Sequence, residues 1–272
     1  MIAFLVLTNL FSLMFLVSMY RTMFTSPGRI PDTKEWREIP TARTGKSELK
    51  RTTGGQRYCR WCRKTKPDRA HHCRVCDECT LKMDHHCPWL GNCIGFRNYK
   101  FFVLTLLYGG AALLNCALAS GGMSIFLGTA HGALDTTENT VRFSFSITLC
   151  VASFVGWTVV SIFSSIHAVM ILKGLTTIEV FEKGGASGED GCCLKTLCCE
   201  SKSDPGYVPS RYKLSSAFDN IKAALGEDWY FWLIPTKPRM GTGSADGLQY
   251  EVNFRPEIDE DDSPLLPSNM SY

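Results

Sequence analysis

The chain has 272 residues, 13 cysteines, a formal net charge of +3 and a mean hydropathy near zero. This length has room for one large domain or two small ones. The average hydropathy hides three long segments that are almost free of charged residues, which excludes a water-soluble globular protein and indicates a membrane protein with soluble parts.

The three apolar segments are residues 1–20, which contain no charged residue, and residues 101–127 and 143–172, which contain almost none. About 20 apolar residues are enough to cross a hydrocarbon core as a helix, so we predict three transmembrane spans. A secretory signal peptide is the alternative for the first segment. No basic region precedes it and no small-residue cleavage site is clear, so we interpret it as an uncleaved span.

Charge predicts the orientation of these spans. Residues 21–100 contain 18 Lys and Arg against 8 Asp and Glu, whereas residues 128–142 contain one Arg and two acids. Positive charge favours the cytosol, so we place the basic segment and residues 173–239 there and the short loop in a lumen or outside the cell. The excess of basic residues fits attraction to anionic lipid, and it also fits a surface for a polyanionic cofactor head group.

Residues 57–100 contain an internal repeat with a shift of fourteen residues. The pattern Cys-x2-Cys-x9-His-x6-Cys occurs twice. Each copy supplies three thiolates and one imidazole, the set that a closed tetrahedral zinc site requires, and a reducing compartment favours metal over disulfides. The predicted ligands are Cys59, Cys62, His72 and Cys79 for one ion, and Cys73, Cys76, His86 and Cys93 for the other.

A further shift of fourteen residues isolates Cys87. It would begin a third copy, but no metal ligand stands at the other three positions, which hold Leu90, Lys100 and Leu107. The second copy also has Asp84 where the first has Ala70. Cys87 and Asp84 are therefore the additions that the metal pattern does not explain.

These additions suit nucleophilic chemistry. A thiolate needs a base or cation beside it, and a histidine base needs a carboxylate to fix its tautomer. Asp84, His85 and Cys87 supply those three parts, so we interpret them as catalytic. The alternative is a spare buried thiol at Cys87 and a solvated acid at Asp84. His71 occupies the place of His85 without these partners, and we predict a structural role for it.

The position of Cys87, fourteen residues before the second apolar segment, predicts its substrate. A fatty acyl thioester of coenzyme A fits such a site, with the tail between helices and the nucleotide against the basic segment. Thiol–thioester exchange is nearly balanced in free energy. The acyl group can therefore move to Cys87 and then to another thiol.

The motif Asp84-His85-His86-Cys87, within the cysteine-rich residues 57–100, resembles that of the DHHC-type protein S-acyltransferases, or palmitoyltransferases. Three more stretches resemble motifs of this family: "SPGRIP" at residues 26–31, "TTIE" at residues 176–179 and "FDNIKAALGEDWYFWLIP" at residues 218–235. The resemblance implies two structural zinc ions and an acyl-CoA donor. Cys87 is then the acylated nucleophile, His85 the base and Asp84 its orienting group.

The same resemblance implies the fold and the setting. We expect an all-α membrane bundle with a small cytosolic zinc-bound cysteine-rich domain, in a multi-pass protein of the Golgi or another endomembrane, with the plasma membrane as an alternative. Its partners are then the bilayer, acyl-CoA and cytosolic-face cysteines of substrate proteins. The family usually has two spans before the cysteine-rich domain and this chain has one, so an inactive truncated form without the first helix is one alternative. A non-catalytic zinc-organised scaffold is another, and three spans argue against nucleic-acid binding.

The region after the third span carries smaller signals. Apolar residues at helical spacing predict an amphipathic helix: Leu214, Phe218, Ile221 and Leu225. We expect Asn220 to have a structural role, and Thr176 and Glu179 either to cap a helix or to lie beside the active site. A cysteine cluster is either a site of accessory acylation or without a role: Cys192, Cys193, Cys198 and Cys199. Residues 240–272 are predicted to be a disordered acidic tail.

Overall fold

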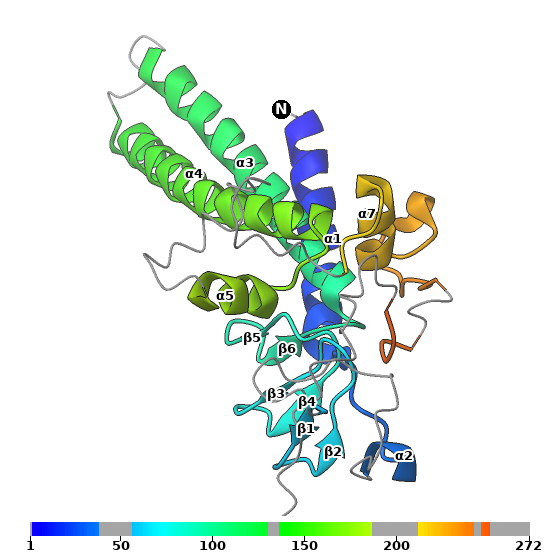
Figure 1. Ribbon diagram of the computed structural model, residues 1–272. Coiled ribbons are helices and arrows are strands. Elements are labelled where there is room, and N and C mark those ends of the chain that lie inside the picture. The colour runs from blue at the N-terminus through cyan, green and yellow to red at the C-terminus, as the bar shows by residue number, and fades with distance from the viewer. Residues whose placement is uncertain (1, 38–55, 130–135, 187–211, 242–245, 251–272) are drawn as a thin grey trace, which may run out of the picture.

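Three long helices form a bundle that carries small β hairpins at one end (Figure 1). The computed structural model describes residues 2–37, 56–129, 136–186, 212–241 and 246–250. The helices are α1 (Ile2–Phe24), α3 (Tyr99–Thr129) and α4 (Thr137–Leu172), and each is long and apolar enough to cross a membrane. α3 packs against both of the others. The end of α1, the start of α3 and the end of α4 all lie beside the hairpins (Figure 1).

Small and polar side chains set the contacts between these helices. Gly109 of α3 lies under the Phe15 ring of α1, so close that an added Cβ would come within 3.1 Å of the ring. Thr22 and Thr105 share a buried hydrogen bond of 3.2 Å, and Asn115 donates to a carbonyl of α1 at 3.1 Å. Buried polar groups in an apolar surrounding need such internal partners, and small residues let helices approach closely.

α4 extends beyond the apolar stretch of its sequence. It begins at Thr137 because Thr136 caps it, with the Thr136 hydroxyl accepting the Asn139 N–H at 3.3 Å. Glu138 and Arg142 add an ion pair one turn apart on the exposed side of the helix. Capping and charge pairing therefore start this helix where hydropathy gives no signal.

Three antiparallel hairpins build the cysteine-rich part, which hydropathy alone does not predict. They pair β1 (Tyr58–Cys59) with β2 (Lys64–Thr65), β3 (His71–Cys73) with β4 (Glu78–Thr80), and β5 (His85–Cys87) with β6 (Asn92–Ile94). The turns contain a left-handed residue at the same place each time, with φ of 52° at Arg63, 52° at Asp77 and 60° at Gly91. The fourteen-residue sequence repeat is thus a structural repeat with three members.

Two asparagines fix the third hairpin to the helices. The last carbonyls of a helix lack partners within it. Asn92 donates to the carbonyls of Thr22 and Met23 at 3.1 and 3.0 Å, where α1 ends. Asn98, which is fully buried, donates to the Cys93 carbonyl at 2.9 Å and accepts the Gly95 N–H at 2.9 Å. The strand pair that carries residues 85–87 is therefore held against the helical bundle.

The remaining described elements are α2 (Lys34–Arg37), α5 (Thr177–Ala186), α7 (Ala217–Leu225) and the short helix η1 (Trp229–Phe231). α7 packs against α3 and α4. Its buried residues are Asn220 and Ala224, whereas Phe218 of the predicted apolar stripe is 48% exposed. The Asn220 side chain bonds backbone atoms of Leu214 and Ser216, which confirms its structural role.

Residues 251–272 and the cluster Cys192, Cys193, Cys198 and Cys199 lie outside the described part of the chain.

Candidate active site

The structure brings together both predicted sets of metal ligands, one of Cys59, Cys62, His72 and Cys79, the other of Cys73, Cys76, His86 and Cys93. In the second set the three sulfurs lie 3.4–3.7 Å from His86 Nδ1. A tetrahedral zinc ion with ordinary bond lengths separates sulfur from nitrogen by about 3.6 Å and two sulfurs by about 3.8 Å. In the first set Cys62 Sγ and Cys79 Sγ lie 3.3 and 4.0 Å from His72 Nδ1. Both donor sets fit a tetrahedral metal ion.

The ligands are shared between hairpins. The hairpin of β3 and β4 gives His72 and Cys79 to one set and Cys73 and Cys76 to the other. Each set therefore joins this hairpin to a neighbour. Two metal ions would tie the three hairpins into one unit.

Cys87 lies in the third copy of the same turn and outside both ligand sets. In the first two copies the leading cysteine sulfur accepts a backbone N–H three residues later, at 3.5 Å for Cys59 and 3.4 Å for Cys73. At Cys87 the Leu90 N–H donates to the backbone carbonyl of Cys87 at 3.2 Å, and the N–H groups of Trp89 and Leu90 lie near enough to the sulfur to lower the pKa of its thiol. Because Leu90 replaces the second cysteine, this turn keeps its donors but has no metal partner.

His85 connects Cys87 to Asp84. Its Nδ1 lies 2.7 Å from Asp84 Oδ2, and the ring lies near enough to Cys87 for each group to stabilise the charged form of the other. Burial raises the pKa of the Cys87 thiol, but the hydrogen bond to His85 and the backbone N–H groups lower it more, so the net pKa lies below the usual range. Burial lowers the pKa of His85, yet its bonds to Asp84 and Cys87 raise it to about 9. The pair therefore favours a thiolate beside an imidazolium.

Thr177 holds the Asp84 carboxylate from the other side. Its backbone N–H donates to Asp84 Oδ1 at 3.0 Å and its hydroxyl donates to Oδ2 at 2.7 Å. Thr177 is the first residue of α5, where free N–H groups favour a negative charge. The pKa of Asp84 is raised by burial and lowered more by its hydrogen bonds, so it stays below the ordinary value.

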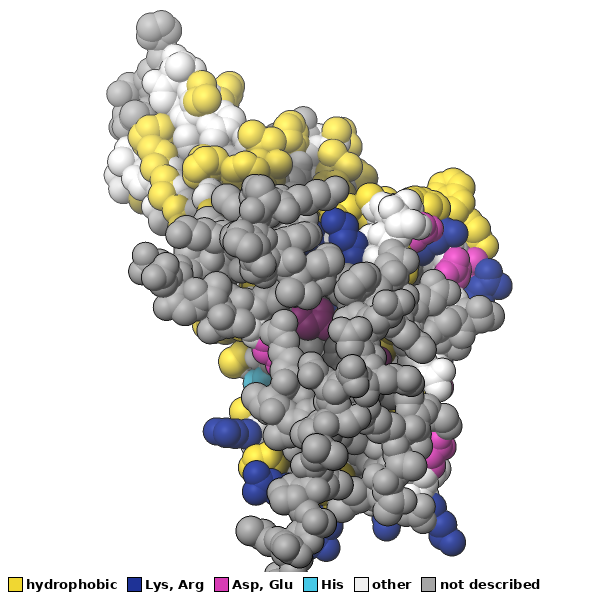
Figure 2. All heavy atoms as spheres, in the orientation of Figure 1, with side chains coloured by type: hydrophobic (Ala, Val, Ile, Leu, Met, Phe, Trp, Pro, Cys, Tyr) yellow, Lys and Arg dark blue, Asp and Glu magenta, His cyan; other side chains and the backbone are white. Residues whose placement is uncertain are grey.

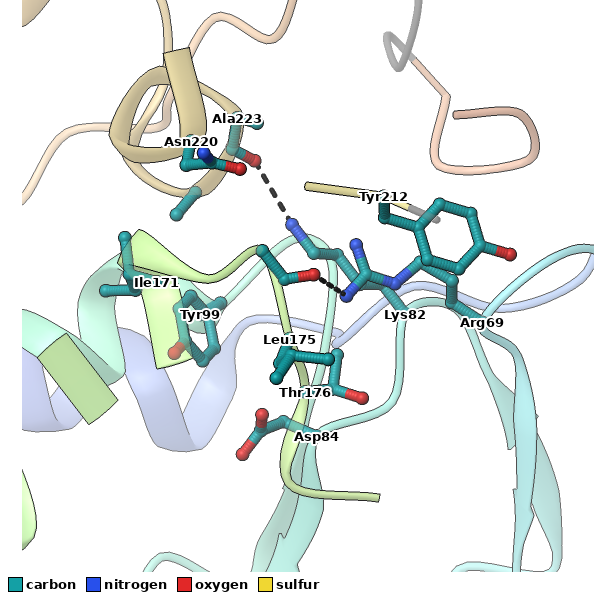
Figure 3. Close-up of a pocket in the computed structure, with 12 residues that line it drawn as sticks. Arg69, Lys82, Asp84, Tyr99, Ile171, Leu175, Thr176, Tyr212, Asn220 and Ala223 are labelled. Carbon is teal, nitrogen blue, oxygen red and sulfur yellow. Dashed lines mark hydrogen bonds between the residues drawn. The ribbon is translucent and has the colours of Figure 1, made fainter. Parts of the chain in front are cut away.

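Thr176 and Glu179 cap a helix and also lie beside the candidate active site, the two roles that the sequence left open. Glu179 accepts the Thr176 N–H at 2.9 Å and the Thr176 hydroxyl accepts the Glu179 N–H at 3.4 Å, which is a reciprocal capping box for α5. Glu179 also pairs with buried Arg69 through two bonds of 2.7 Å. Figure 3 shows the pocket at this junction, where Arg69, Lys82 and Asp84 come from the cysteine-rich part and Thr176 follows α4. The cap thus ties α5, and with it Thr177, to the hairpins.

Two residues of the helices complete the surroundings of His85. His167 of α4 is 2% exposed, and its ring centre lies 6.0 Å from that of His85. Phe102 packs edge-on against both histidines, with ring centres at 5.2 and 5.0 Å. The Tyr99 hydroxyl lies 3.3 Å from His167 Nδ1. None of these residues lies in a sequence motif. His71, for which the sequence predicts a structural role, contacts Arg57.

A comparison with protein families matches residues 52–184 to the model of the DHHC palmitoyltransferase family. The chain belongs to this family. Palmitoyltransferase ZDHHC20 of Homo sapiens is 34% identical over 265 residues, covering 90% of the chain and 66% of that protein. Palmitoyltransferase ZDHHC15 of Mus musculus is 29% identical over 221 residues, covering 81% of the chain and 56% of that protein. Palmitoyltransferase pfa3 of Emericella nidulans is 38% identical over 138 residues, 48% of the chain and 25% of that protein. The chain thus spans about half to two thirds of the length of ZDHHC15 and ZDHHC20. The match to the DHHC family model includes all eight metal-ligand candidates and Asp84, His85 and Cys87.

Proposed function

We propose that this DHHC-family chain is a protein S-acyltransferase, which moves a long-chain acyl group such as palmitoyl from acyl-CoA to Cys87 and then to a cysteine of a substrate protein. The observation that carries the proposal is the position of Cys87. This thiol lies outside both metal-ligand sets and near His85, whose Nδ1 bonds Asp84. The family match and the names of the relatives support the same activity.

The geometry assigns a task to each group in the first step. The Cys87 thiolate attacks the thioester carbonyl, the carbon–sulfur bond to coenzyme A breaks, and His85 gives its proton to the departing thiolate. Asp84 keeps the His85 Nδ1–H oriented and offsets the imidazolium charge, as a carboxylate does for a histidine base. In the second step His85 takes the proton of a substrate thiol, and that sulfur displaces Cys87 from the acyl group.

The two ligand sets would hold two structural zinc ions, which supply no step of this chemistry and instead fix the hairpins around Cys87.

We also propose a membrane setting for this chain. Trp89, at the tip of the turn that carries Cys87, is 92% exposed, and Trp favours the interface between water and lipid. Figure 2 shows apolar side chains over the helices at one end of the molecule, and Lys and Arg side chains at mid-height and around the opposite end. This distribution supports a multi-pass membrane protein that takes acyl-CoA at its basic side. We propose the Golgi or another endomembrane, or the plasma membrane, from the family resemblance alone.

A non-catalytic scaffold is the other candidate. Metal-held hairpins alone would serve that role, and they would not need the bond between Asp84 and His85 or a free thiol at Cys87. The buried acid, the histidine and the thiol together favour the enzyme.

Incubation of the purified chain with labelled palmitoyl-CoA tests the activity. We expect a hydroxylamine-sensitive label on the wild type and none on Cys87→Ser. The matched control is Cys150→Ser, which removes a thiol from α4 far along the chain from the hairpins and should keep the label. Label retained by Cys87→Ser would count against the proposal.

Metal analysis tests the two structural sites. We expect two zinc ions per chain in the wild type and in Cys87→Ser, because Cys87 binds no metal. Cys59→Ala and Cys73→Ala remove one ligand each from different sets and should lower the zinc content and the melting temperature. A loss of zinc in Cys87→Ser would contradict the assignment of the ligands.

A further inference from the structure

Asp84, His85 and His167 form a third group of side chains of the types that bind metal ions in the described part of the chain, with one donor atom from each lying within 4.8 Å of the others. We propose that this group is a low-affinity Zn²⁺ site and that metal bound there inhibits acyl transfer. The inhibitory part of the inference rests on the proposed function, whereas the binding part does not.

The surroundings already provide what such ligands need. Histidines that bind metal usually donate their second N–H to an oxygen, and carboxylates that bind metal usually accept hydrogen bonds as well. The Tyr99 oxygen lies 3.3 Å from His167 Nδ1 and can accept its N–H, which leaves the Nε2 lone pair for a metal. Thr177 supplies two hydrogen bonds to Asp84.

His85 offers the third donor through Nδ1, the nitrogen that lies 2.7 Å from Asp84 Oδ2. In the resting site this nitrogen carries a proton that it donates to the carboxylate. A Zn²⁺ ion between the two groups replaces that proton, which leaves to solvent. Two imidazoles and one carboxylate are a common donor set for zinc, with water in the fourth position.

Bound metal would stop the histidine from acting as a base. With Zn²⁺ on Nδ1, the neutral His85 ring carries its remaining proton on Nε2, the nitrogen left to face Cys87. A neutral ring gives up its Nε2 proton to the departing thiolate of the first step far less readily than an imidazolium does, and it has no lone pair to accept the proton of a substrate thiol in the second step. The metal therefore locks the tautomer that is wrong for catalysis, although it touches neither Cys87 nor the acyl group.

The spacing and burial of these donors predict that this site binds Zn²⁺ more weakly than the two sets of Cys and His ligands do. Donor atoms in a tetrahedral nitrogen and oxygen site lie about 3.3 Å apart, so this group must contract around the ion, and Asp84 is only 1% exposed. The His85 side chain, which is 22% exposed, gives the ion its way in. Two structural ions should bind first and the third only at higher free Zn²⁺.

Zinc titration of the full chain in detergent tests the site directly. Every variant is made with Cys192, Cys193, Cys198 and Cys199 replaced by Ser, so that this cluster cannot bind the ion. We expect the parent to rise from two to three Zn²⁺ per chain and His167→Gln to need at least about tenfold more free Zn²⁺ for the third ion, since loss of even an indirect partner costs ten- to a hundredfold. Phe163→Leu is the matched control: it alters packing on the His167 ring, whose centre lies 4.7 Å away, but leaves the donor in place and should still bind three.

Autoacylation measured in the same titration tests the inhibition. Rates are normalised to each variant without added metal. The parent and Phe163→Leu should lose activity as the third ion binds and regain it after brief chelation, while His167→Gln should need at least about tenfold more Zn²⁺ for the same loss.

A parent that stays at two ions, or His167→Gln that binds the third ion as tightly as the parent, overturns the site. Three ions with full activity overturn the inhibition. If the parent has no activity before Zn²⁺ is added, the proposed function fails, and the binding titration alone then decides whether the metal site exists.

Discussion

At the scale of single residues, Cys87 differs from Cys59 and Cys73 mainly in its side-chain partners. N–H groups of the same kind of turn lie near all three sulfurs, although the Leu90 N–H donates to the Cys87 carbonyl. Backbone N–H groups of this kind stabilise a thiolate whether or not a metal is bound. Leu90, in place of a second cysteine, therefore leaves this copy of the predicted metal-binding turn with a free thiol whose pKa is lowered.

Thr177 gives a test of how the acid is held. Thr177→Val removes the hydroxyl that donates to Asp84 Oδ2 at 2.7 Å but keeps the backbone N–H bond and the side-chain volume. A hydrogen bond to a charged group contributes about 1.5–3 kcal/mol, so we expect autoacylation of Cys87 to slow roughly ten- to a hundredfold. Single-turnover labelling measures the rate. Thr177→Ser restores a hydroxyl and should recover most of it, and equal rates in Val and wild type would mean that Asp84 is oriented by its other contacts.

The sequence identified most of this site because most of it is local. The predicted metal ligands, Asp84, His85 and Cys87 lie within 35 residues, where fixed spacing reports hairpin geometry directly. Thr177, which lies in the TTIE stretch, and His167, which lies in no motif, come from elements about 80 to 90 residues further along the chain. Only the packing of α4 and α5 against the hairpins brings them to Asp84, and no spacing rule encodes that packing.

At the scale of elements, the helices were predictable and the strands were not. Long apolar segments indicate membrane helices from composition alone. Strands of two or three residues are too short to show an alternating pattern, and the ligand pairs and turns hold them in place. The start of α4 depends on the Thr136 cap, which hydropathy does not register.

Asn98 tests how the third hairpin is attached to the helices. Asn98→Ala leaves the Gly95 N–H and the carbonyls of Cys93 and Thr22 without this partner in a fully buried place. Unsatisfied buried groups cost about 1–3 kcal/mol each, so we expect a lower melting temperature in detergent and slower autoacylation. Asn92→Ala is the matched control, because Asn92 is only partly buried and its loss should cost less. Equal and small effects of both substitutions would mean that apolar packing alone holds the hairpin.

At the scale of the whole molecule, three segments distant in sequence meet at one pocket. The hairpins contribute Arg69 and Lys82, the turn after α4 contributes Gly174 and Thr176, and α7 covers them with Ala223 (Figure 3). Lys82 donates to the Ala223 carbonyl at 3.1 Å, and Arg69 donates to the Gly174 carbonyl at 3.0 Å. Two cations therefore lie together under α7, which links the stability of this assembly to pH.

The pKa of Lys82 gives the sign of that linkage. Burial and the nearby Arg69 lower the pKa of Lys82 to about 7, against an ordinary value of 10.5. Between these two values the unfolded chain keeps a proton that the folded chain has lost, so stability rises with pH, by at most about 1.4 kcal/mol per pH unit for one proton. Below pH 7 both states are protonated and this contribution is constant.

We expect the melting temperature of the wild type, relative to that of Lys82→Met, to be flat from pH 5.5 to 6.5 and to rise from pH 7 to 9. Lys222→Met, on the more exposed side of α7, should run parallel to the wild type. A constant difference between wild type and Lys82→Met across this range would mean that water reaches the ammonium group and that α7 does not seal the pocket.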